Sequence, residues 1–482
     1  YYNEIFADPV ALDRVYSMDT YLRVTDDGGK TWRRLGQQSR HVDDHVIWVD
    51  PRDTDHYLVG GDGGLYESFD RAATWRFFDN LPITQFYRVA VDEAWPTYYV
   101  YGGTQDNNTL GGPNRTLRLQ GPANGEWFVT QGGDGFYSQI DPTNPDIVYS
   151  EAQHGALTRY DRKSGENVDI QPQPAAGEAP YRWNWDSPLV LSPHSPTRLY
   201  FAANKLFRSD DRGDSWRVVS SDLTRQLDRD RLQVFGRVQK ADAVARHAST
   251  SYYGNIVALD ESAKVEGLLY AGTDDGLVQV SENGGADWRA VERFPGVPDR
   301  SYVSRLVASR HDADVVYAAF DNHKMGEFEP YLLKSADRGR TWKSIASDLP
   351  ERGTVYALVE DPVAPGLLFA GTEFGLYLTL DGGGAWVELT GGLRTINVRD
   401  LAIQRREGDL VVATFGRGFY ILDDLTPLRA LSKAALEQAT LSFPVAPAWL
   451  HVPTSLIGGR GKGFLGETYY TGANPPLGAT LT

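Results

Sequence analysis

A short turn recurs six times along this chain and restricts the folds that it can adopt. Each copy runs Ser or Thr, any residue, Asp, any residue, Gly, two further residues and Trp, with a few departures. The hydroxyl and the carboxylate can accept backbone N–H groups inside a tight turn, while Gly takes a positive φ that other residues resist. The Trp can then fill an adjacent core. The copies begin at Thr25, Ser68, Ser209, Ser281, Ser335 and Thr379.

Three copies depart from the pattern. Ala72 stands where Gly is expected, Asn283 replaces the Asp, and Gly384-Ala385 replaces the usual Lys-Thr pair. A methyl group at positive φ or a lost carboxylate weakens such a turn without abolishing it. We therefore expect six turns, three of them weaker.

The turn lies within a longer repeat. An apolar strand, an Asp-Pro or similar bend, a second strand, a Gly-rich step and a third strand precede it, and a fourth strand follows the Trp. This order is typical of a propeller blade, and about nine such units follow one another at a spacing of roughly 40 residues. The 49 Gly and 26 Pro residues punctuate many short strands. The sequence therefore predicts an all-β fold, a β-propeller of four-stranded blades.

The overall composition excludes several functions. The net charge of −16 argues against a nucleic-acid partner, because phosphate binding needs clustered Lys and Arg. No stretch approaches the ~20 apolar residues of a membrane span. The chain has no Cys, which removes thiol nucleophiles, disulfides and thiolate metal sites. No cofactor is expected.

Two carboxylates stand in similar Gly-rich steps. Asp62 and Asp134 each lie in a Gly-Gly-Asp-Gly sequence, which brings the side chain onto a loop at the end of a strand. A pair of such carboxylates could act as the acid and base of hydrolysis. The alternative is a turn in which Asp bonds its own backbone.

A polar segment beside the first of these steps has the residue types of a metal site. Alternate residues of a strand share one face, so a strand here would bring His41, Asp43 and His45 together. Imidazole and carboxylate groups can bind a metal ion. The alternative is a hydrogen-bonded loop that packs against Trp48 and the next blade.

Two further segments could contact a ligand. Gln105, Asp106 and Asn107 form a polar run where a strand is expected to open into a loop that reaches Asn114, and they could bind sugar hydroxyls or cap a blade. Trp183 and Trp185 are expected to share one face of a strand. They could stack on a sugar ring or fill a gap between blades.

The turn is similar to the Asp-box, also called the bacterial neuraminidase (BNR) repeat. The chain resembles bacterial BNR-repeat proteins described as glycosyl hydrolases with a sortilin-like propeller, and it also resembles two-propeller xyloglucanase-type hydrolases. The resemblance covers nearly the whole chain, and it extends beyond the turns to residues 41–45, 60–64, 85–89, 103–107, 132–135 and 414–418.

The resemblance implies a division of the chain into three parts. Residues 1–80 would be the last blades of an upstream propeller, residues 81–430 a complete seven-bladed propeller, and residues 431–482 a linker and the start of a C-terminal β domain. Both ends are therefore expected to be truncated. The family also implies an extracytoplasmic protein, periplasmic or secreted, whose signal peptide is not in this chain.

Three functions remain open at this stage. The first is an extracytoplasmic propeller that binds a glycan or a protein partner through its loop face. The second is an inverting glycoside hydrolase that acts on a polysaccharide in a cleft between two propellers, with Asp62 or Asp134 as one carboxylate. The third is a propeller subunit or assembly factor docked on a larger complex. The sequence leaves the oligomeric state open.

Two related activities are disfavoured. True sialidases begin their arginine triad with an Arg-Ile-Pro stretch, which this chain lacks. Sortilin-type receptors carry a cysteine-rich module, which a chain without Cys cannot form. If the protein is an enzyme, glycoside hydrolysis is therefore the activity that the resemblance favours.

Overall fold

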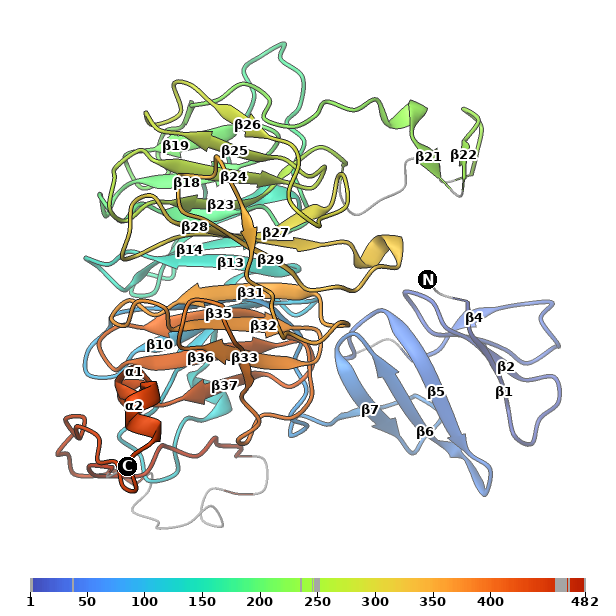
Figure 1. Cartoon of the computed structure of the whole chain (residues 1–482). Helices are drawn as coiled ribbons and strands as arrows, with labels where there is room; N and C mark the ends of the chain where they lie inside the picture. The colour runs from blue at the N-terminus through green and yellow to red at the C-terminus, as the bar shows by residue number, and fades with distance from the viewer. Residues whose placement is uncertain are drawn as a thin grey trace. The chain divides into compact units, whose positions relative to one another are not determined.

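The computed structural model describes residues 3–36, 39–234, 236–244, 246, 252–455, 466 and 469–480. The predicted all-β class is confirmed (Figure 1). Within these residues the strands form eight four-stranded sheets, one three-stranded sheet and one two-stranded hairpin, all antiparallel. The helical elements are short: α1 (Thr426–Ala430), α2 (Lys433–Leu436), η1 (Asn124–Glu126), η2 (Gln153–Gly155), η3 (Arg229–Arg231) and η4 (His323–Met325).

The chain forms two compact units. The first comprises Tyr1–Ile83 and Gln105–Asn107, and the second comprises Thr84–Thr104 and Asn108–Thr482. Two sheets make up the first unit, and their facing sides enclose a core that includes Tyr16. Their strands are β1 (Ile5–Ala7), β2 (Val15–Ser17), β3 (Arg23–Thr25), β4 (Arg33–Arg34), β5 (Asp44–Asp50), β6 (Asp53–Gly61), β7 (Gly64–Ser68) and β8 (Arg76–Phe77).

The second unit contains the remaining sheets. Its hairpin, β21–β22, interrupts the repeat between β20 and β23 and projects away from the other strands of this unit (Figure 1). The strands are β9 (Phe86–Val91), β10 (Tyr99–Thr104), β11 (Thr109–Pro113), β12 (Phe128–Gln131), β13 (Gly135–Ile140), β14 (Ile147–Ala152), β15 (Ala156–Asp161), β16 (Asn167–Asp169), β17 (Leu189–Leu191), β18 (Leu199–Ala202), β19 (Leu206–Ser209), β20 (Arg217–Val218), β21 (Gln233–Val234), β22 (Arg237–Val238), β23 (Ile256–Glu261), β24 (Leu269–Thr273), β25 (Val278–Ser281), β26 (Arg289–Val291), β27 (Tyr302–Ala308), β28 (Val316–Asp321), β29 (Tyr331–Ser335), β30 (Lys343–Ser344), β31 (Val355–Glu360), β32 (Leu368–Thr372), β33 (Gly375–Thr379), β34 (Val387–Glu388), β35 (Val398–Gln404), β36 (Asp409–Thr414) and β37 (Phe419–Leu422).

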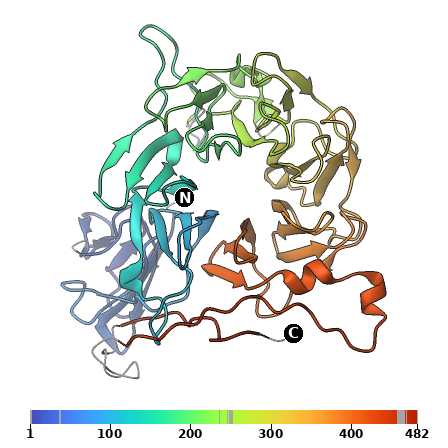
Figure 2. The same cartoon turned by 90° about the vertical axis from the view of Figure 1, so that its left-hand side faces the viewer.

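The sheets of the second unit follow one another in a circle (Figure 2). The first strand of each sheet contacts the first strand of the next, in the order β9, β13, β17, β23, β27, β31, β35, and β35 contacts β9. Several hydrogen bonds join the last sheet to the first. The Val89 N–H donates to the Asp400 carboxylate at 3.1 Å, and the Tyr98 hydroxyl donates to Asp409 at 2.9 Å. This arrangement is consistent with a multi-bladed propeller.

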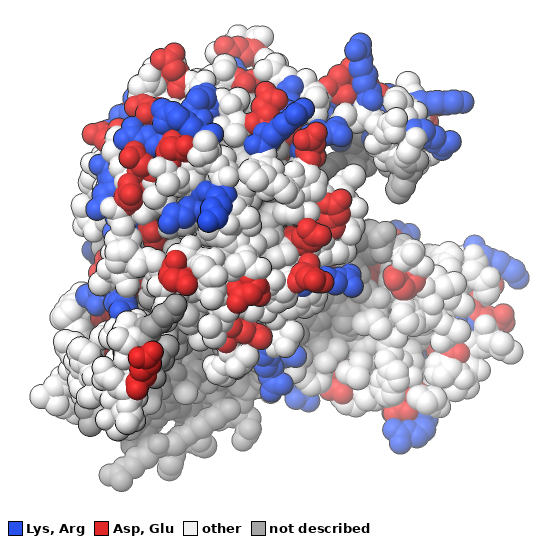
Figure 3. Space-filling model, viewed as in Figure 1, with Lys and Arg blue, Asp and Glu red and all other residues white. Residues whose placement is uncertain are grey.

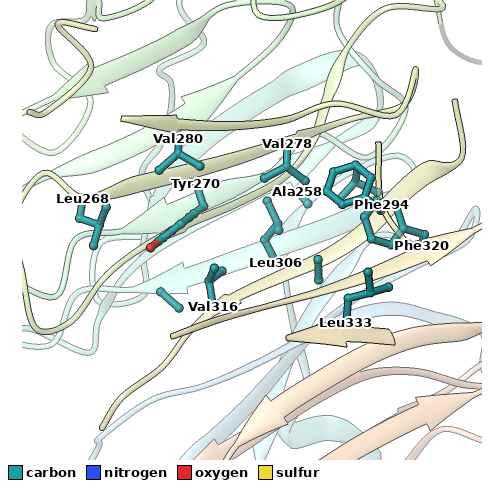
Figure 4. Close-up of a cluster of buried hydrophobic side chains, with 13 residues drawn as sticks. Ala258, Leu268, Tyr270, Val278, Val280, Phe294, Leu306, Val316, Phe320 and Leu333 are labelled. Atoms are coloured by element: carbon teal, nitrogen blue, oxygen red, sulfur yellow. The ribbon is translucent and has the colours of Figure 1, made fainter. Parts of the chain in front are cut away.

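Apolar side chains between neighbouring sheets form the core. In β28 the even residues Val316, Ala318 and Phe320 pack toward β23–β26, while Tyr317 and Ala319 pack toward β31–β34. Because both faces of the strand are covered, its apolar residues run without polar interruption. Figure 4 shows the cluster on the first of these faces. Burying each large apolar side chain stabilises the fold by about 1.5–3 kcal/mol.

All six repeated turns form. In regular copies the first hydroxyl accepts the N–H four residues later, as from Gly213 to Ser209 at 2.8 Å. The copy with Ala72 keeps this bond at 2.9 Å although Ala72 has a φ of 69°. The copy with Asn283 keeps it at 2.8 Å, from Gly285 to Ser281, and there the Asn283 amide also donates to the Asp287 carboxylate at 2.9 Å. The substitutions therefore alter the turns without removing them.

In four copies the Trp of the turn also links neighbouring sheets. The indole N–H of Trp216 donates to the Ile170 carbonyl at 2.7 Å, beyond the outer strand of the preceding sheet. Trp386 bonds the Ile345 carbonyl at 2.8 Å in the same way. Trp32, in the first sheet, instead bonds within its own turn and is 42% exposed. The predicted core position therefore fails for Trp32.

The C-terminal segment packs against the loop between β11 and β12. Leu119 donates to the Thr454 carbonyl at 2.9 Å, and Gly472 donates to the Pro122 carbonyl at 2.8 Å. Within this segment α2 is a single helical turn. In the described part of residues 431–482 the only bridges are isolated ones to this loop, and residues 456–465, 467–468 and 481–482 lie outside the described ranges.

Candidate functional site

One end of the second unit, called the mouth here, brings together two kinds of segment. Each hairpin between the second and third strands of a sheet lies beside the residue that precedes the first strand, because the strands are antiparallel. Backbone hydrogen bonds of 3.0 Å fix this contact in three sheets. The bonds run from Asp274 to Asn255, from Glu373 to Thr354 and from Phe415 to Asn397.

Seven side chains from four consecutive sheets are connected at the mouth. We call this set the mouth cluster. Tyr87 comes from the sheet of β9, two residues follow or end β28, two belong to the sheet of β31, and two belong to the sheet of β35. Its members are Tyr87, Asp321, His323, Tyr356, Glu373, Arg399 and Phe415.

An arginine joins the aromatic members of the mouth cluster. The Arg399 guanidinium lies 4.5 Å from the Tyr356 ring centroid and 5.8 Å from that of Phe415. Tyr87 extends the row, since its ring centroid is 5.6 Å from that of Phe415. Arg399, Phe415 and Tyr87 are half-buried, so each keeps part of its surface in solvent.

Hydrogen bonds occupy the carboxylates of the mouth cluster. The Tyr356 hydroxyl donates to Glu373, and the His323 Nδ1 lies 2.6 Å from Asp321. Burial raises the pKa of Tyr356, and the bond to Glu373 raises it further. The phenol therefore stays protonated as a donor at physiological pH.

A second polar group lies at the start of β13 and contains two predicted site residues. The Trp185 indole N–H donates to the Asp134 carboxylate at 3.1 Å, and the Asp134 N–H donates to the Gln153 side chain at 2.9 Å. His154 packs edge-on against Trp185 at 4.8 Å. Burial lowers the pKa of His154. Asp134 is held by its neighbours and is 7% exposed.

Asp274 is an unusual carboxyl at the mouth that the sequence analysis did not select. It accepts backbone N–H groups from Gly254 and Asn255 at 3.0 and 2.8 Å. Burial raises its pKa to about 7, and the neighbouring Asp275 contributes to the increase. The repeat itself could have indicated Asp274. This residue follows a Gly-Thr step in the hairpin of its sheet, at the position that Asp62 occupies in the hairpin of the first unit.

Asp62 and His45 meet in the first unit. The His45 Nε2 lies 2.8 Å from Asp62 Oδ1, and the Asn107 amide donates to the Asp62 carbonyl at 2.8 Å. The predicted catalytic residue of this unit therefore contacts one of the predicted metal ligands. Its catalytic role stays a prediction.

The geometry behind the predicted metal site is wrong. Strand β5 begins at Asp44, so His41 and Asp43 precede it, and Asp43 has a φ of 67° that breaks strand alternation. The His41 ring bonds the Val42 carbonyl at 2.7 Å, while His45 turns to Asp62. Across the described ranges no group of three or more His, Cys, Asp or Glu side chains is placed to hold a metal ion.

Two other local predictions are corrected. Gln105, Asp106 and Asn107 do not open a long loop, because Thr109–Pro113 forms β11; positive φ at Asp106 lets the hairpin turn tightly. Within this tip the Asn107 amide also donates to the Gln105 carbonyl at 2.9 Å. These three residues hold the hairpin tip beside Asp62, and a role in ligand binding stays a prediction.

The two tryptophans do not share a strand face. Residues 181–186 contain no strand, so the expected alternation is absent. Trp183 stacks on Phe201 and Phe207 at 4.9 and 5.6 Å and packs in the core, while Trp185 contacts Asp134 at the mouth. Trp183 therefore fills the interior, and a role of Trp185 in ligand binding stays a prediction.

Two ion pairs link first strands that are not neighbours in the circle. Arg88 in β9 binds Asp186, which precedes β17, at 2.6 Å, and its guanidinium lies 4.5 Å from the Tyr137 ring. Arg305 in β27 binds Asp400 in β35. In the circle, β13 lies between the partners of the first pair and β31 between those of the second. Both pairs therefore lie toward the centre of the circle.

The central charges are strongly desolvated. Burial lowers the pKa of Arg305 to about 10, and the positive charge of Arg88 contributes to the decrease. Burial also raises the pKa of Glu151 well above its ordinary value, and Asp186 raises it further. The Ser187 N–H donates to Glu151 at 2.6 Å. The centre is thus a packed polar cluster.

The surface charge is mixed. On the face in Figure 3, Lys and Arg alternate with Asp and Glu, and no single basic area covers it. Within the described ranges, no helix combines the length and apolar character that crossing a membrane requires.

Comparisons with known proteins give distant structural similarities. No protein-family model and no curated protein matches the chain. The computationally designed Ika8 protein is 12% identical with a TM-score of 0.40, over 77% of this chain and 93% of that one. A GH74 enzyme of Niastella koreensis is 15% identical with a TM-score of 0.28, over 87% of this chain and 67% of that one.

Proposed function

We propose that the second unit is a seven-bladed β-propeller that binds a glycan at its mouth. The observation that carries the proposal is the half-buried row of Tyr87, Phe415 and Arg399. Aromatic rings stack on the apolar faces of sugars, and carboxylates such as Glu373 and Asp321 accept sugar hydroxyls. The mouth therefore places aromatic rings next to carboxylates. This combination matches a sugar, which has apolar faces and hydroxyl groups at its edges.

The centre of the unit favours binding at the mouth rather than through the circle. The ion pairs of Arg88 and Arg305 occupy the space between first strands. Removing either partner would leave a buried charge without its counterion, which costs several kcal/mol. A ligand that leaves these pairs intact must be held at the end of the circle.

Binding can be tested with a panel of oligosaccharides and calorimetry on the whole chain. We expect Phe415→Ala to weaken glycan binding at least tenfold, because it removes a stacking surface. Phe69→Ala is the matched control, since Phe69 is exposed in the first unit and stacks on His56 outside the mouth. A protein partner captured without any glycan binding, or equal loss in both variants, would contradict the proposal.

A second candidate is inverting glycoside hydrolysis. It is favoured by Asp274, because a carboxyl with a pKa of about 7 can donate a proton near neutral pH. Asp134 and Asp62 remain candidates for the second carboxylate. A reducing-end assay on glucan, xylan and xyloglucan should detect release that Asp274→Asn abolishes. No release from any of them would exclude this activity for these substrates.

We also infer that residues 1–80 are two blades of another propeller, that residues 81–430 are the complete one, and that residues 431–482 lead to a further β domain. The first two sheets pack face to face, and β5 leaves Val46 and Trp48, 48% and 44% exposed, on the side away from that core. An additional blade would cover such a face. A periplasmic or secreted location stays part of this proposal.

A further inference from the structure

Arg399 is a cation without a carboxylate partner. The described residues offer its guanidinium two aromatic rings and no ion pair or hydrogen bond. In contrast, the other arginines of the inner strands β9 and β27 that point toward the centre, Arg88 and Arg305, each bind an Asp. A half-buried guanidinium in a chain of net charge −16 would be expected to find an acid.

The nearby acids are already engaged. Glu373 accepts the Tyr356 hydroxyl, and Asp321 accepts both the ring and the backbone N–H of His323. Aromatic rings cover the flat faces of a guanidinium group, so only its N–H edges are left to donate hydrogen bonds to a ligand. Those edges match the two oxygens of a carboxylate.

We propose that Arg399 binds the carboxylate of an acidic sugar, so that the glycan recognised at the mouth contains hexuronate units. This inference rests on the proposed glycan binding. A ligand dense in negative charge would be repelled by Glu373 and Asp321, which face the same mouth. A uronate combines one carboxylate for Arg399 with hydroxyls that can donate to the oxygen lone pairs which the protein bonds of those two acids leave unused. An acidic peptide offers the charge without the hydroxyls.

The test is calorimetry on the whole chain with two tetrasaccharides that each carry one uronate, galacturonate in one and glucuronate in the other, and with a neutral galactose tetrasaccharide. We expect at least one acidic ligand to bind more tightly than the neutral one, with an affinity that falls as salt rises. Arg399→Gln should weaken that binding roughly tenfold to hundredfold, because a hydrogen-bonded ion pair is lost. Arg399→Lys should recover part of it, since Lys keeps the charge and lacks the planar fork.

Arg34→Gln is the matched control. Arg34 also lies over an aromatic ring, 3.8 Å from the Tyr21 centroid, but in the first unit. Its substitution removes the same charge from the chain and should leave uronate affinity unchanged. Circular dichroism of each variant checks that the fold is retained.

Each other outcome overturns the inference. Equal affinity for neutral and acidic ligands, unaffected by Arg399→Gln, would leave glycan binding standing and remove its acidic specificity. Binding of a glutamate oligopeptide but of no tetrasaccharide would replace the glycan by an acidic peptide. Binding of none of these ligands would remove both proposals.

Discussion

Replacing Asp274 by Asn should make the protein more stable at alkaline pH. The side chain is 8% exposed, and burial raises its pKa from 3.8 to about 7. A carboxyl with a raised pKa binds its proton more tightly in the folded state, so its contribution to stability is complete below about pH 4 and is lost as pH rises through about 7. A shift of roughly three pKa units corresponds to about 4 kcal/mol.

The amide of the Asp274→Asn variant never ionises, so this pH dependence should disappear with the carboxyl. The amide oxygen can keep the bonds to the Gly254 and Asn255 N–H groups at 3.0 and 2.8 Å. The new NH₂ group gains no acceptor among these partners, which costs about 1 kcal/mol. The variant should therefore be slightly less stable than the parent at pH 4.5 and more stable by about 2–3 kcal/mol at pH 8.5.

Urea unfolding followed by tryptophan fluorescence measures this difference at each pH. Asp337→Asn is the control of opposite sign, because hydrogen bonds led by that from Thr341 hold the pKa of Asp337 at about 2. That variant should lose stability above about pH 4, and the loss should fade as pH approaches 2. A difference between Asp274→Asn and the parent that stays constant from pH 4.5 to 8.5 would refute the reasoning.

Three further substitutions test other parts of the fold by thermal and urea unfolding. Arg88→Ala should cost about 3–5 kcal/mol, because it leaves Asp186 buried without its partner; a cost below about 1 kcal/mol would show that the central pair is not structural. Trp216→Phe should cost about 1–2 kcal/mol, since a carbonyl of the preceding sheet loses its donor, and an unchanged midpoint would contradict this. Asn283→Asp restores the usual residue of the turn, yet it should destabilise the fold by up to about 1 kcal/mol, because the new carboxylate is repelled by that of Asp287. Adding Asp287→Thr should reverse this loss of stability.

The local features of the fold were readable from the sequence, and the contacts between distant segments were not. The turns and strands depend on neighbours within a few residues, so their pattern was visible. Asp134 lies on the connection between β12 and β13, directly before a strand, in agreement with the predicted loop at a strand end. The strand alternation predicted for His41, Asp43 and His45 fails because Asp43 has a positive φ, which an Asp seldom adopts. The mouth cluster joins Tyr87 to residues from sheets that come much later in the chain, and no local pattern marks such a contact.

The bond between the Val89 N–H and Asp400 joins residues 311 positions apart. Closing a loop of that length costs roughly 5 kcal/mol of chain entropy beyond a constant, so the sheets between must be largely formed before the bond becomes favourable. Val411 and Ala413 cover the apolar face around Phe86 in the folded unit. During synthesis this face stays uncovered until these two residues have been made. The newly made chain therefore exposes this apolar face until nearly all of the second unit has left the ribosome. Aggregation is most probable before the last sheet has packed against the first.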